Sequence, residues 1–341
     1  MSSPTPTPVD IDPDLHRAHA LPPSVYHQPR WFERITERVL RRTWHGLADP
    51  PPASQPGSVQ PWNLLPGSLD EALVITHDDT GPHLLSNACT RCRTLLVTRA
   101  GRAEALPCPG GDRRYALDGR RTDADGDALV AVPWAHWGGL PFASLDPSHP
   151  FDALLEDLPL PLRSRPWDER TTVPALCRDY DVATSWLQYC EHMLDPGLGF
   201  EPQQPWPTIE LLRHGAVIDR SKVAADADAP APPGRPAAST TVWLFPCTIV
   251  DIHPWGTSTR LLLPLAPQRT RIVVIGQRWD GSAVEAEAPR TLDTVEHHAQ
   301  GLLTLAAAGV RSRLARRRTY DAARDRGVHH FHRQLAALLD T

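Results

Sequence analysis

Short apolar runs separated by glycine, aspartate and proline fill residues 64–147 of this chain. The runs are Ala72–Thr76, His83–Ser86, Thr94–Val97, Arg114–Leu117 and Ala128–Val132. Runs of four or five residues are too short for helices, and turn-forming residues between such runs are typical of strands that reverse direction. The pattern therefore predicts a small antiparallel β domain.

Two cysteine-containing segments lie within this predicted domain. The first is Cys89-Thr90-Arg91 and the second, after sixteen intervening residues, is Cys108-Pro109-Gly110-Gly111. A Rieske [2Fe–2S] centre takes two thiolates on one iron and two imidazoles on the other, from Cys-x-His and Cys-x-x-His segments with a spacer of this size. Arg91 and Gly111 stand at the two histidine positions, and neither offers a lone pair to a metal. We therefore expect no cluster here.

The remaining sequence predicts helices and a second group of strands. Residues 30–44 (RWFERITERVLRRTW) place apolar side chains at the spacing of an amphipathic helix, and a Pro-rich connector covers residues 49–61. Further elements are a helix over Val182–Leu194, strands over Thr240–Ile252, Ser258–Leu265 and Thr270–Gln277, and closing helices over Leu292–Ala308 and Asp321–Leu339. We assign residues 21–48 to an N-terminal helix that packs on the C-terminal domain, residues 49–160 to the β domain, and residues 161–341 to a larger domain.

Composition excludes several classes of function. The net charge is −5, which provides no basic surface for nucleic acid or for an anionic membrane. No run of 18 apolar residues is present, so we expect no membrane-spanning helix. Six cysteines without a secretory signal point to a reducing compartment, and we expect a cytoplasmic protein. Residues 1–20 are predicted to form a flexible tail, and residues about 222–239, rich in Ala, Asp and Pro, a disordered loop.

Five features, in the order that the family has them, resemble the catalytic α subunit of Rieske non-haem iron oxygenases. They are the opening helix with Arg41-Arg42-Thr43-Trp44, the segments Asn87-Ala88-Cys89 and Cys108-Pro109 with Tyr115-Ala116-Leu117-Asp118-Gly119 after them, the helix Trp186–Leu198, the pair Phe245-Pro246, and the closing Gly327-Val328-His329-His330-Phe331-His332. The resemblance implies an α+β fold, with a Rieske-like small antiparallel β domain and a larger catalytic-type domain. In the larger domain a twisted antiparallel sheet covered by helices would hold a ligand pocket.

The resemblance also implies where the mononuclear iron ligands would lie. Asp195 matches the acidic residue that passes electrons from a neighbouring subunit's cluster to the iron. The first histidine ligand falls on Leu198, the second falls near Gln203, and the carboxylate ligand is matched best by Asp293. A facial triad needs two histidines and one carboxylate to hold ferrous iron. We therefore expect a metal-free relative of the oxygenases, with no cofactor and no dioxygen chemistry.

Two other groups of residues resemble metal sites less well. Cys89, Cys92 and Cys108 could hold zinc, but structural zinc takes four ligands and Asp112 is the nearest, unusual, candidate for the fourth. Small buried thiols left in an ancestral loop are the favoured interpretation. His329 and His332 share a helix face, and we interpret them as packing or surface histidines because nothing else marks a site there.

The acids around the former iron site are the candidate catalytic groups. Glu191 and Asp195 are four residues apart on one helix, so they share a face that the family turns toward its cavity. In an apolar pocket the pKa of Asp195 and of Asp293 would rise, which suits a general acid or base near neutral pH. Asp195 and Asp293 are the first candidates, with Glu191 and Tyr189 as alternates. These groups equally fit retained acids that have no catalytic use.

Three functions remain open for such a chain. The first is a cofactor-independent cyclase, isomerase or lyase that performs redox-neutral chemistry, including cycloaddition, on a hydrophobic intermediate of natural-product biosynthesis. The second is a structural or regulatory subunit, because the family forms rings in which a metal-free subunit could still take a place. It would act as a homo-oligomer, such as a trimer, or as a hetero-oligomer with an oxygenase paralogue. The third is a ligand-binding protein that uses the same pocket.

Overall fold

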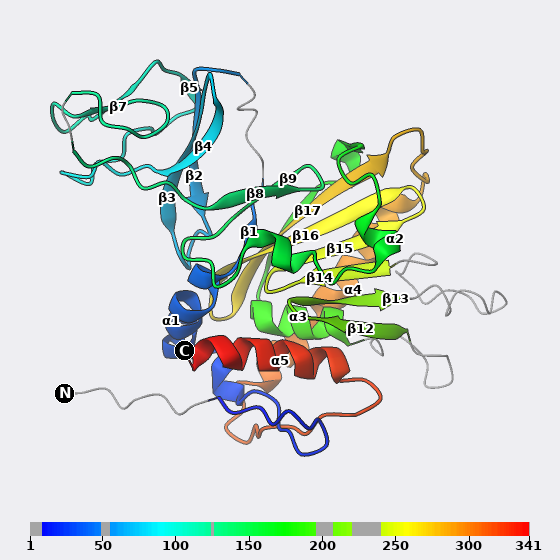
Figure 1. Cartoon of the computed structure of the whole chain (residues 1–341). Helices are drawn as coiled ribbons and strands as arrows, with labels where there is room; N and C mark the ends of the chain where they lie inside the picture. Colours follow the sequence, from blue (N-terminus) through cyan, green and yellow to red (C-terminus); the bar gives the residue numbers. More distant parts are fainter. Residues whose placement is uncertain (1–8, 49–54, 124–125, 196–206, 220–239, 341) are drawn as a thin grey trace, which may run out of the picture.

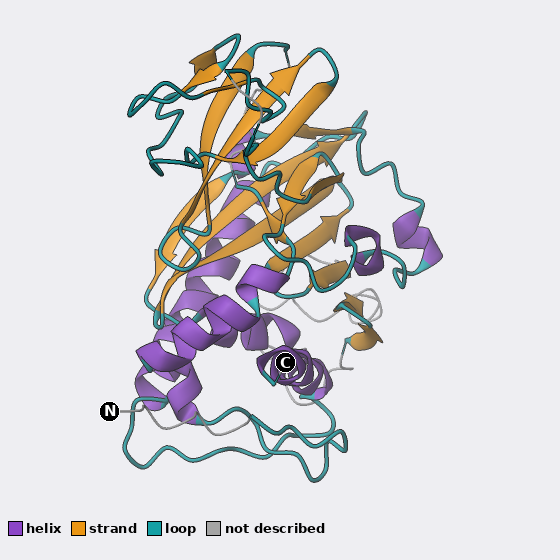
Figure 2. Ribbon diagram, turned by 60° about the vertical axis from the view of Figure 1, so that its left-hand side comes forward, coloured by secondary structure: helices purple, strands orange, loops and turns teal. Residues whose placement is uncertain are grey.

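The computed structural model describes residues 9–48, 55–123, 126–195, 207–219 and 240–340. It contains a small β domain, a large antiparallel sheet and a group of helices on one face of that sheet. Figure 1 shows the small domain at the upper left, the large sheet at the centre right, and α1 and α5 beneath them. Figure 2 shows most of the helices gathered on one side of the strands. The predicted α+β class is confirmed.

The small domain is built on a four-stranded sheet in the order β4-β3-β2-β5. Its strands are β2 (Ser58–Leu64), β3 (Glu71–Asp78), β4 (Gly81–Ser86) and β5 (Gly101–Arg102), and the short pair β6 (Leu106–Pro107) and β7 (Arg114–Tyr115) lies beside it. The runs predicted over Thr94–Val97 and Ala128–Val132 contribute only single bridges. The strand β2 was missed because it begins in the segment interpreted as a Pro-rich connector.

A short three-stranded sheet, in the order β1-β9-β8, lies between the small domain and the large sheet (Figure 1). Its strands are β1 (His45–Gly46), β8 (Trp134–Trp137) and β9 (Leu140–Ala143). The side chain of Phe142 is fully buried there and stacks at a tilt against Phe151, with ring centroids 5.1 Å apart. This sheet therefore joins the two main parts of the molecule through one continuous apolar core.

The large sheet has eight strands, and every adjacent pair runs antiparallel. They are β10 (Arg170–Thr172), β11 (Arg178–Val182), β12 (Thr208–Leu212), β13 (Gly215–Asp219), β14 (Thr240–Leu244), β15 (Thr248–His253), β16 (Gly256–Ala266) and β17 (Arg269–Trp279). The single strand predicted over residues 240–252 is a hairpin, because the chain turns at Phe245–Cys247 between β14 and β15. The two longest strands, β16 and β17, match the strands predicted over Ser258–Leu265 and Thr270–Gln277.

Successive residues of these strands point to opposite faces of the sheet. One face carries Trp243, Ile249 and Leu262, which belong to the same core cluster as the apolar residues of the helices. The opposite face carries Val242 and Val250, which pack against residues 158–167. Both faces are therefore covered, which explains why β14 and β15 are apolar on both sides.

The helices are α1 (Pro29–Arg38), α2 (Leu160–Arg163), α3 (Trp186–Leu194), α4 (Ala288–Gly309) and α5 (Arg326–Leu339). Short 3₁₀ helices cover Pro23–Tyr26, Leu40–Arg42, Phe151–Leu154 and Pro174–Leu176. The side chain of Phe331 in α5 meets Trp186 of α3 and Trp243 of the sheet, with ring centroids 5.8 Å and 5.5 Å apart. None of the helices described is long and apolar enough to cross a membrane.

The N-terminal segment differs from the flexible tail predicted over residues 1–20. Within the described part of it, Val9 and Ala18 are each only 1% exposed. The backbone N–H of Ala20 donates to the carbonyl of Arg318 at 2.8 Å, and Arg317 donates to the carbonyl of Ala20 at 2.7 Å. The N-terminal segment needs few apolar residues of its own to be ordered, because it packs on a core that includes the C-terminal part of the chain. Residues 1–8 and most of the predicted loop at 222–239 lie outside the described residues.

Candidate functional site

The two cysteine segments of the small domain lie against each other. The sulfur atoms of Cys89, Cys92 and Cys108 all lie within 4.8 Å of one another. The Cys92 and Cys108 sulfurs are 3.3 Å apart, and the Cys89 sulfur lies 3.4 Å from the Tyr115 hydroxyl. Cys89 and Cys108 are buried and Cys92 is exposed, so the group has one open side.

The surroundings of these thiols shift their pKa values in opposite directions. Burial acts to raise the pKa of Cys89, but hydrogen bonds from the Cys92 backbone, Tyr115 and the Arg91 backbone outweigh it and lower the pKa to about 6. The hydrogen bond with Cys92, together with burial, raises the pKa of Cys108 to about 11. The thiols thus behave as one interacting group, and Cys89 is the sulfur that its surroundings favour as thiolate.

Arg91 and Gly111, at the two former histidine positions, face solvent. The Arg91 side chain is 68% exposed, and its guanidinium lies 3.6 Å from the carboxylate of Asp112 in the other cysteine segment. No heavy atom lies within 4 Å of a Cβ placed on Gly111. An exposed ion pair of this kind contributes little stability. Neither side chain offers a ligand atom for a metal bound at the sulfurs.

Helix α3 brings Glu191 into a row of hydrogen-bonded side chains from distant parts of the chain. The Tyr26 hydroxyl donates to Glu191 Oε1 at 2.5 Å, and His332 Nε2 lies 2.8 Å from the same oxygen. On the other side of the imidazole, the Tyr320 hydroxyl lies 2.6 Å from His332 Nδ1. Glu191 therefore belongs to a row of four residues, Tyr320–His332–Glu191–Tyr26.

His332, interpreted from the sequence as a packing or surface histidine, is fully buried in the interior of this row. The row was missed because its members come from four separate segments of the sequence. Burial and the neighbouring Glu191 raise the pKa of both Tyr320 and Tyr26, so both phenols stay protonated at neutral pH. A carboxylate on Nε2 favours the tautomer that donates to Glu191, which leaves Nδ1 to accept from the Tyr320 hydroxyl.

Asp195 lines the same surface depression as Tyr320, which is one end of this row. Helix α3 ends at Leu194, and Asp195 has an extended backbone, so it no longer continues the helix face of Glu191. Its carboxylate pairs with Arg324, whose Nη2 lies 2.9 Å away. The two residues line a depression of about 360 Å³ together with Arg318, Thr319, Tyr320, Asp321 and Asp325. Asp195 and Tyr320 therefore share one opening, and its lining is charged rather than apolar.

Asp293 has different hydrogen-bond partners from Asp195 and Glu191. Its carboxylate accepts from Arg178 at 2.7 Å and 3.0 Å and from the Tyr180 hydroxyl at 2.8 Å, both on β11. The hydrogen bond from Arg178 lowers the pKa of Asp293, and the expectation that this pKa is raised was therefore wrong. The sequence could not show this difference, because Arg178 is 115 positions away from its partner.

Tyr189 belongs to a second buried polar group, one that the sequence reasoning missed. Its hydroxyl donates to Glu296 Oε2 at 2.7 Å, and the same oxygen lies 3.5 Å from Arg260 Nε. Arg260 also pairs with Asp251 on the neighbouring strand. Arg260 and Glu296 are each 2% exposed, so an arginine and two carboxylates lie between the sheet and helices α3 and α4. The sequence does show a charged residue inside each of two apolar strands, Asp251 in β15 and Arg260 in β16, and this pattern could have indicated the buried group.

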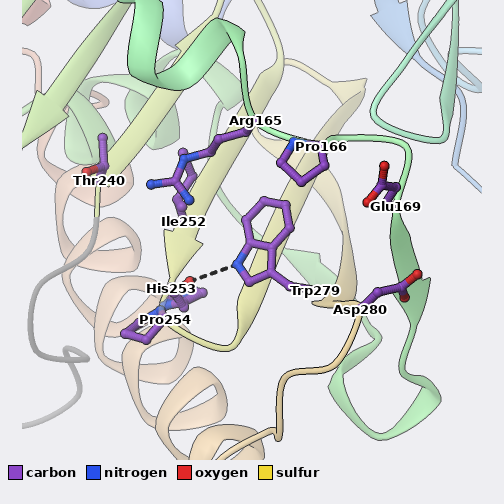
Figure 3. A pocket seen from close by; sticks show the side chains of 9 residues that line it. All are labelled: Arg165, Pro166, Glu169, Thr240, Ile252, His253, Pro254, Trp279 and Asp280. Atoms are coloured by element: carbon purple, nitrogen blue, oxygen red, sulfur yellow. Dashed lines mark hydrogen bonds between the residues drawn. The ribbon is translucent and has the colours of Figure 1, made fainter.

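A further depression, of about 440 Å³, opens at the ends of β15 and β17 (Figure 3). Figure 3 shows the Trp279 ring in its wall, and its indole N–H donates to the carbonyl of His253 at 3.2 Å. The guanidinium of Arg165 lies 5.6 Å from the centre of the same ring. None of the candidate catalytic acids lines this depression.

Comparisons with known proteins identify the fold. No protein-family model matches the chain, and no curated protein matches its sequence. The quaternary ammonium Rieske monooxygenase CntA, solved with L-carnitine, matches with a TM-score of 0.73 at 14% identity, over 97% of this chain and 99% of that one. Naphthalene 1,2-dioxygenase with indole bound matches at 0.66 and 11% identity, over 95% and 92%. The naphthalene 1,2-dioxygenase of Rhodococcus sp. matches at 0.56 and 16% identity, over 94% and 82%.

These matches define the class of structure. The chain has the fold of Rieske oxygenase α subunits over nearly its whole length. At identities of 11–16% the likeness concerns the fold and does not extend to substrate or reaction. What the chain can do chemically therefore depends on its own side chains.

The residues present do not fit the metal groups that this fold implies. A Rieske cluster needs two imidazoles, and the positions of those ligands hold the exposed Arg91 and Gly111, which has no side chain. The iron positions Leu198 and Gln203 lie outside the described residues, and a leucine side chain has no donor atom. Asp293, the expected carboxylate ligand, is held by Arg178 and Tyr180.

Proposed function

We propose that this protein is a cofactor-independent enzyme of the cyclase, isomerase or lyase type, built on the oxygenase fold. The observation that supports this proposal is the row Tyr320–His332–Glu191, which reaches the depression beside Asp195. A phenol, an imidazole and a carboxylate in hydrogen-bonded order are a general base with its orienting group. Such an arrangement can move a proton without a metal.

The proposed reaction begins with removal of a proton from the substrate by the Tyr320 oxygen. As that bond forms, the phenolic proton passes to His332 Nδ1, and Glu191 stabilises the imidazolium that results. The electron pair left on the substrate then closes a ring, shifts a double bond or expels a leaving group, and the proton returns. Tyr320 touches the substrate in this scheme, and His332 and Glu191 act through it.

The charge of the depression narrows the proposed substrate class. Arg318 and Arg324 line it together with three carboxylates, and each arginine is paired with one of them, Asp325 or Asp195. A polar biosynthetic intermediate that hydrogen-bonds to these ion pairs therefore fits better than a purely hydrophobic one. Asp195, paired with Arg324, would position that guanidinium. Asp293 and Tyr189 lie in other groups, and we propose that they support the structure around α4.

A hydrogen-exchange assay tests the proposal. The protein is incubated in D₂O with a panel of 2-oxo and 3-oxo carboxylic acids, and deuterium incorporation next to the carbonyl is followed by NMR. Wild-type protein should accelerate exchange in at least one of them, and Tyr320→Phe should lose at least 100-fold of that rate, in line with general-base catalysis. Tyr180→Phe is the matched control, because it removes a hydroxyl bonded to Asp293 instead. Equal rates in Tyr320→Phe and wild type would exclude the proposed base.

The ion pairs of Asp195 and Asp293, the two acids predicted at the former iron site, favour a second function. Asp195 and Asp293 are each held by an arginine, which is what a purely structural subunit would require. We propose as the alternative that the chain completes a homotrimeric or mixed ring with an oxygenase paralogue. Co-expression with such a paralogue, followed by size-exclusion chromatography, should then give one mixed species. Separate elution of the two proteins would rule out the mixed ring, and elution of this protein alone at the size of a monomer would rule out the homotrimer.

A further inference from the structure

We propose that Cys89, Cys92 and Cys108 bind one Zn²⁺ ion through three thiolates, with the fourth position open to solvent. This site does not depend on the proposed function, because it lies in the small domain and not beside the Tyr320–His332–Glu191 row. Cys92 is the residue that distinguishes it from a Rieske centre, in which only two cysteines take part.

The spacing of the sulfurs carries the proposal. All three lie within 4.8 Å of one another, and one pair is 3.3 Å apart. With zinc–sulfur bonds of about 2.3 Å, two thiolates on a tetrahedral ion are separated by about 3.8 Å. Movements of about 1 Å or less therefore bring each sulfur pair to this separation. The sequence favoured buried thiols over zinc, because it offers no good fourth protein ligand.

The backbone of the first cysteine loop is held in a tight turn that keeps Cys89 and Cys92 on the side of Cys108. The loop closes by a 2.9 Å hydrogen bond from the Arg93 N–H to the Cys89 carbonyl. Arg93 then takes φ = 59°, a left-handed conformation that a non-glycine residue adopts only where the surroundings impose it.

The loop that carries Cys108 lies close against the loop that carries Cys92. A Cβ on Gly110 would lie 3.3 Å from the Cys92 sulfur and 3.0 Å from Thr94 Oγ1. A larger residue at this position would push the two cysteine loops apart. Glycine at position 110 therefore lets the two loops approach without displacing the Cys92 or Thr94 side chain.

The chemistry of the site favours zinc with an exchangeable fourth ligand. Thiolates are soft ligands that suit zinc, and a site with three protein ligands leaves a coordination position for water. Cys92 is exposed, so water reaches the group from that side. Three thiolates and one Zn²⁺ carry a net charge of −1, and Arg91 and Arg113 lie close enough to the loops to balance it.

Cobalt substitution tests the site directly. Reduced, chelator-treated protein is titrated with Co²⁺, and Zn²⁺ is then added as competitor. We expect one equivalent of Co²⁺ to produce thiolate-to-cobalt charge transfer and the intense visible bands of four-coordinate cobalt, and Zn²⁺ to abolish both. Cys92→Ser should weaken cobalt affinity at least 10-fold while its circular dichroism remains that of the wild type. Cys177→Ser, which removes a thiol far from these loops in the sequence, should bind like the wild type.

Three outcomes would overturn the proposal. The first is that the reduced protein binds no cobalt. This outcome counts against the site even if Cys92 and Cys108 form a disulfide in air. The second is equal affinity in Cys92→Ser and wild type. The third is stoichiometric iron with acid-labile sulfide in freshly purified protein, which would mean that the thiols hold an iron–sulfur cluster instead.

Discussion

Replacing Arg260 with methionine is the most informative test of how this fold is held together. Arg260 lies between Asp251 and Glu296 in the core, and its side chain is 3% exposed. Methionine has a similar length and no charge, so Arg260→Met removes the guanidinium and keeps most of the packing volume. The two carboxylates then remain in the interior without this cation.

The expected loss follows from the burial of the group. Removing one partner of a buried ion pair costs about 3–5 kcal/mol, because the remaining charge stays desolvated. Hydrogen bonds from Thr241 to Asp251 and from Tyr189 to Glu296 persist, so we expect the middle of this range, about 4 kcal/mol at pH 7. At roughly 2 °C per kcal/mol for a large domain, the melting temperature should fall by about 8 °C.

The loss should also depend on pH, with a definite sign. Without Arg260, burial raises the pKa of the two carboxylates in the folded protein above their values in the unfolded chain. The unfolded state then binds fewer protons, so the variant gains stability relative to wild type as the pH falls from 7 toward 5. Urea denaturation at both pH values, followed by circular dichroism, measures this change.

A triple variant serves as the control. Asp251→Asn and Glu296→Gln added to Arg260→Met remove all three charges, and replacing a whole buried ion group by neutral residues is often close to neutral in stability. The triple variant should therefore recover more than half of the loss. A single variant within 1 kcal/mol of wild type, or a triple variant less stable than the single one, would refute the reasoning, which rests on the penalty of a buried charge.

Three further predictions concern stability, each measured by urea denaturation. Burial lowers the pKa of His45 to about 4, so below pH 6.5 the unfolded state binds a proton that the folded state does not. Stability therefore falls as the pH falls, by up to about 3 kcal/mol for this residue. His45→Gln should make the dependence of stability on pH shallower, and an unchanged dependence would contradict the prediction. Gly276→Ala should cost about 1–3 kcal/mol, because the new Cβ would meet the Leu176 Cβ at 2.2 Å; an equally stable variant would show that Leu176 moves freely. Asn87→Ala should cost about 2–3 kcal/mol, because its side chain bonds both backbone groups of buried Val97 at 2.7 Å and 2.9 Å; a loss below 0.5 kcal/mol would mean that water replaces both bonds.

Much of the fold could be predicted from local patterns. The strands β16 and β17 have long apolar runs, and α4 and α5 have clear helical periodicity, so each was recognised within a few residues. The hairpin of β12 and β13 was missed because Thr208–Leu212 is largely exposed and its alternation is weak. Its strand character comes from pairing with β13, which the sequence does not show.

The candidate site could be predicted only in part, because its contacts join distant positions. Glu191 and His332 are 141 residues apart, so their hydrogen bond depends on the way α5 docks against α3. The cysteines illustrate the same limit. Their spacing indicated an ancestral metal loop, but whether Cys92 turns toward Cys108 or away from it depends on the backbone at Arg93.

The meeting of the N-terminal and C-terminal segments has a consequence for synthesis of this protein. Arg34 in α1 donates to the carbonyl of Leu339, which lies 305 positions later. At about 5–20 residues per second, the ribosome needs roughly 15–60 s to deliver that partner. Throughout that interval Arg34 lacks this partner. The contact between the two ends can therefore form only after nearly the whole chain has been made.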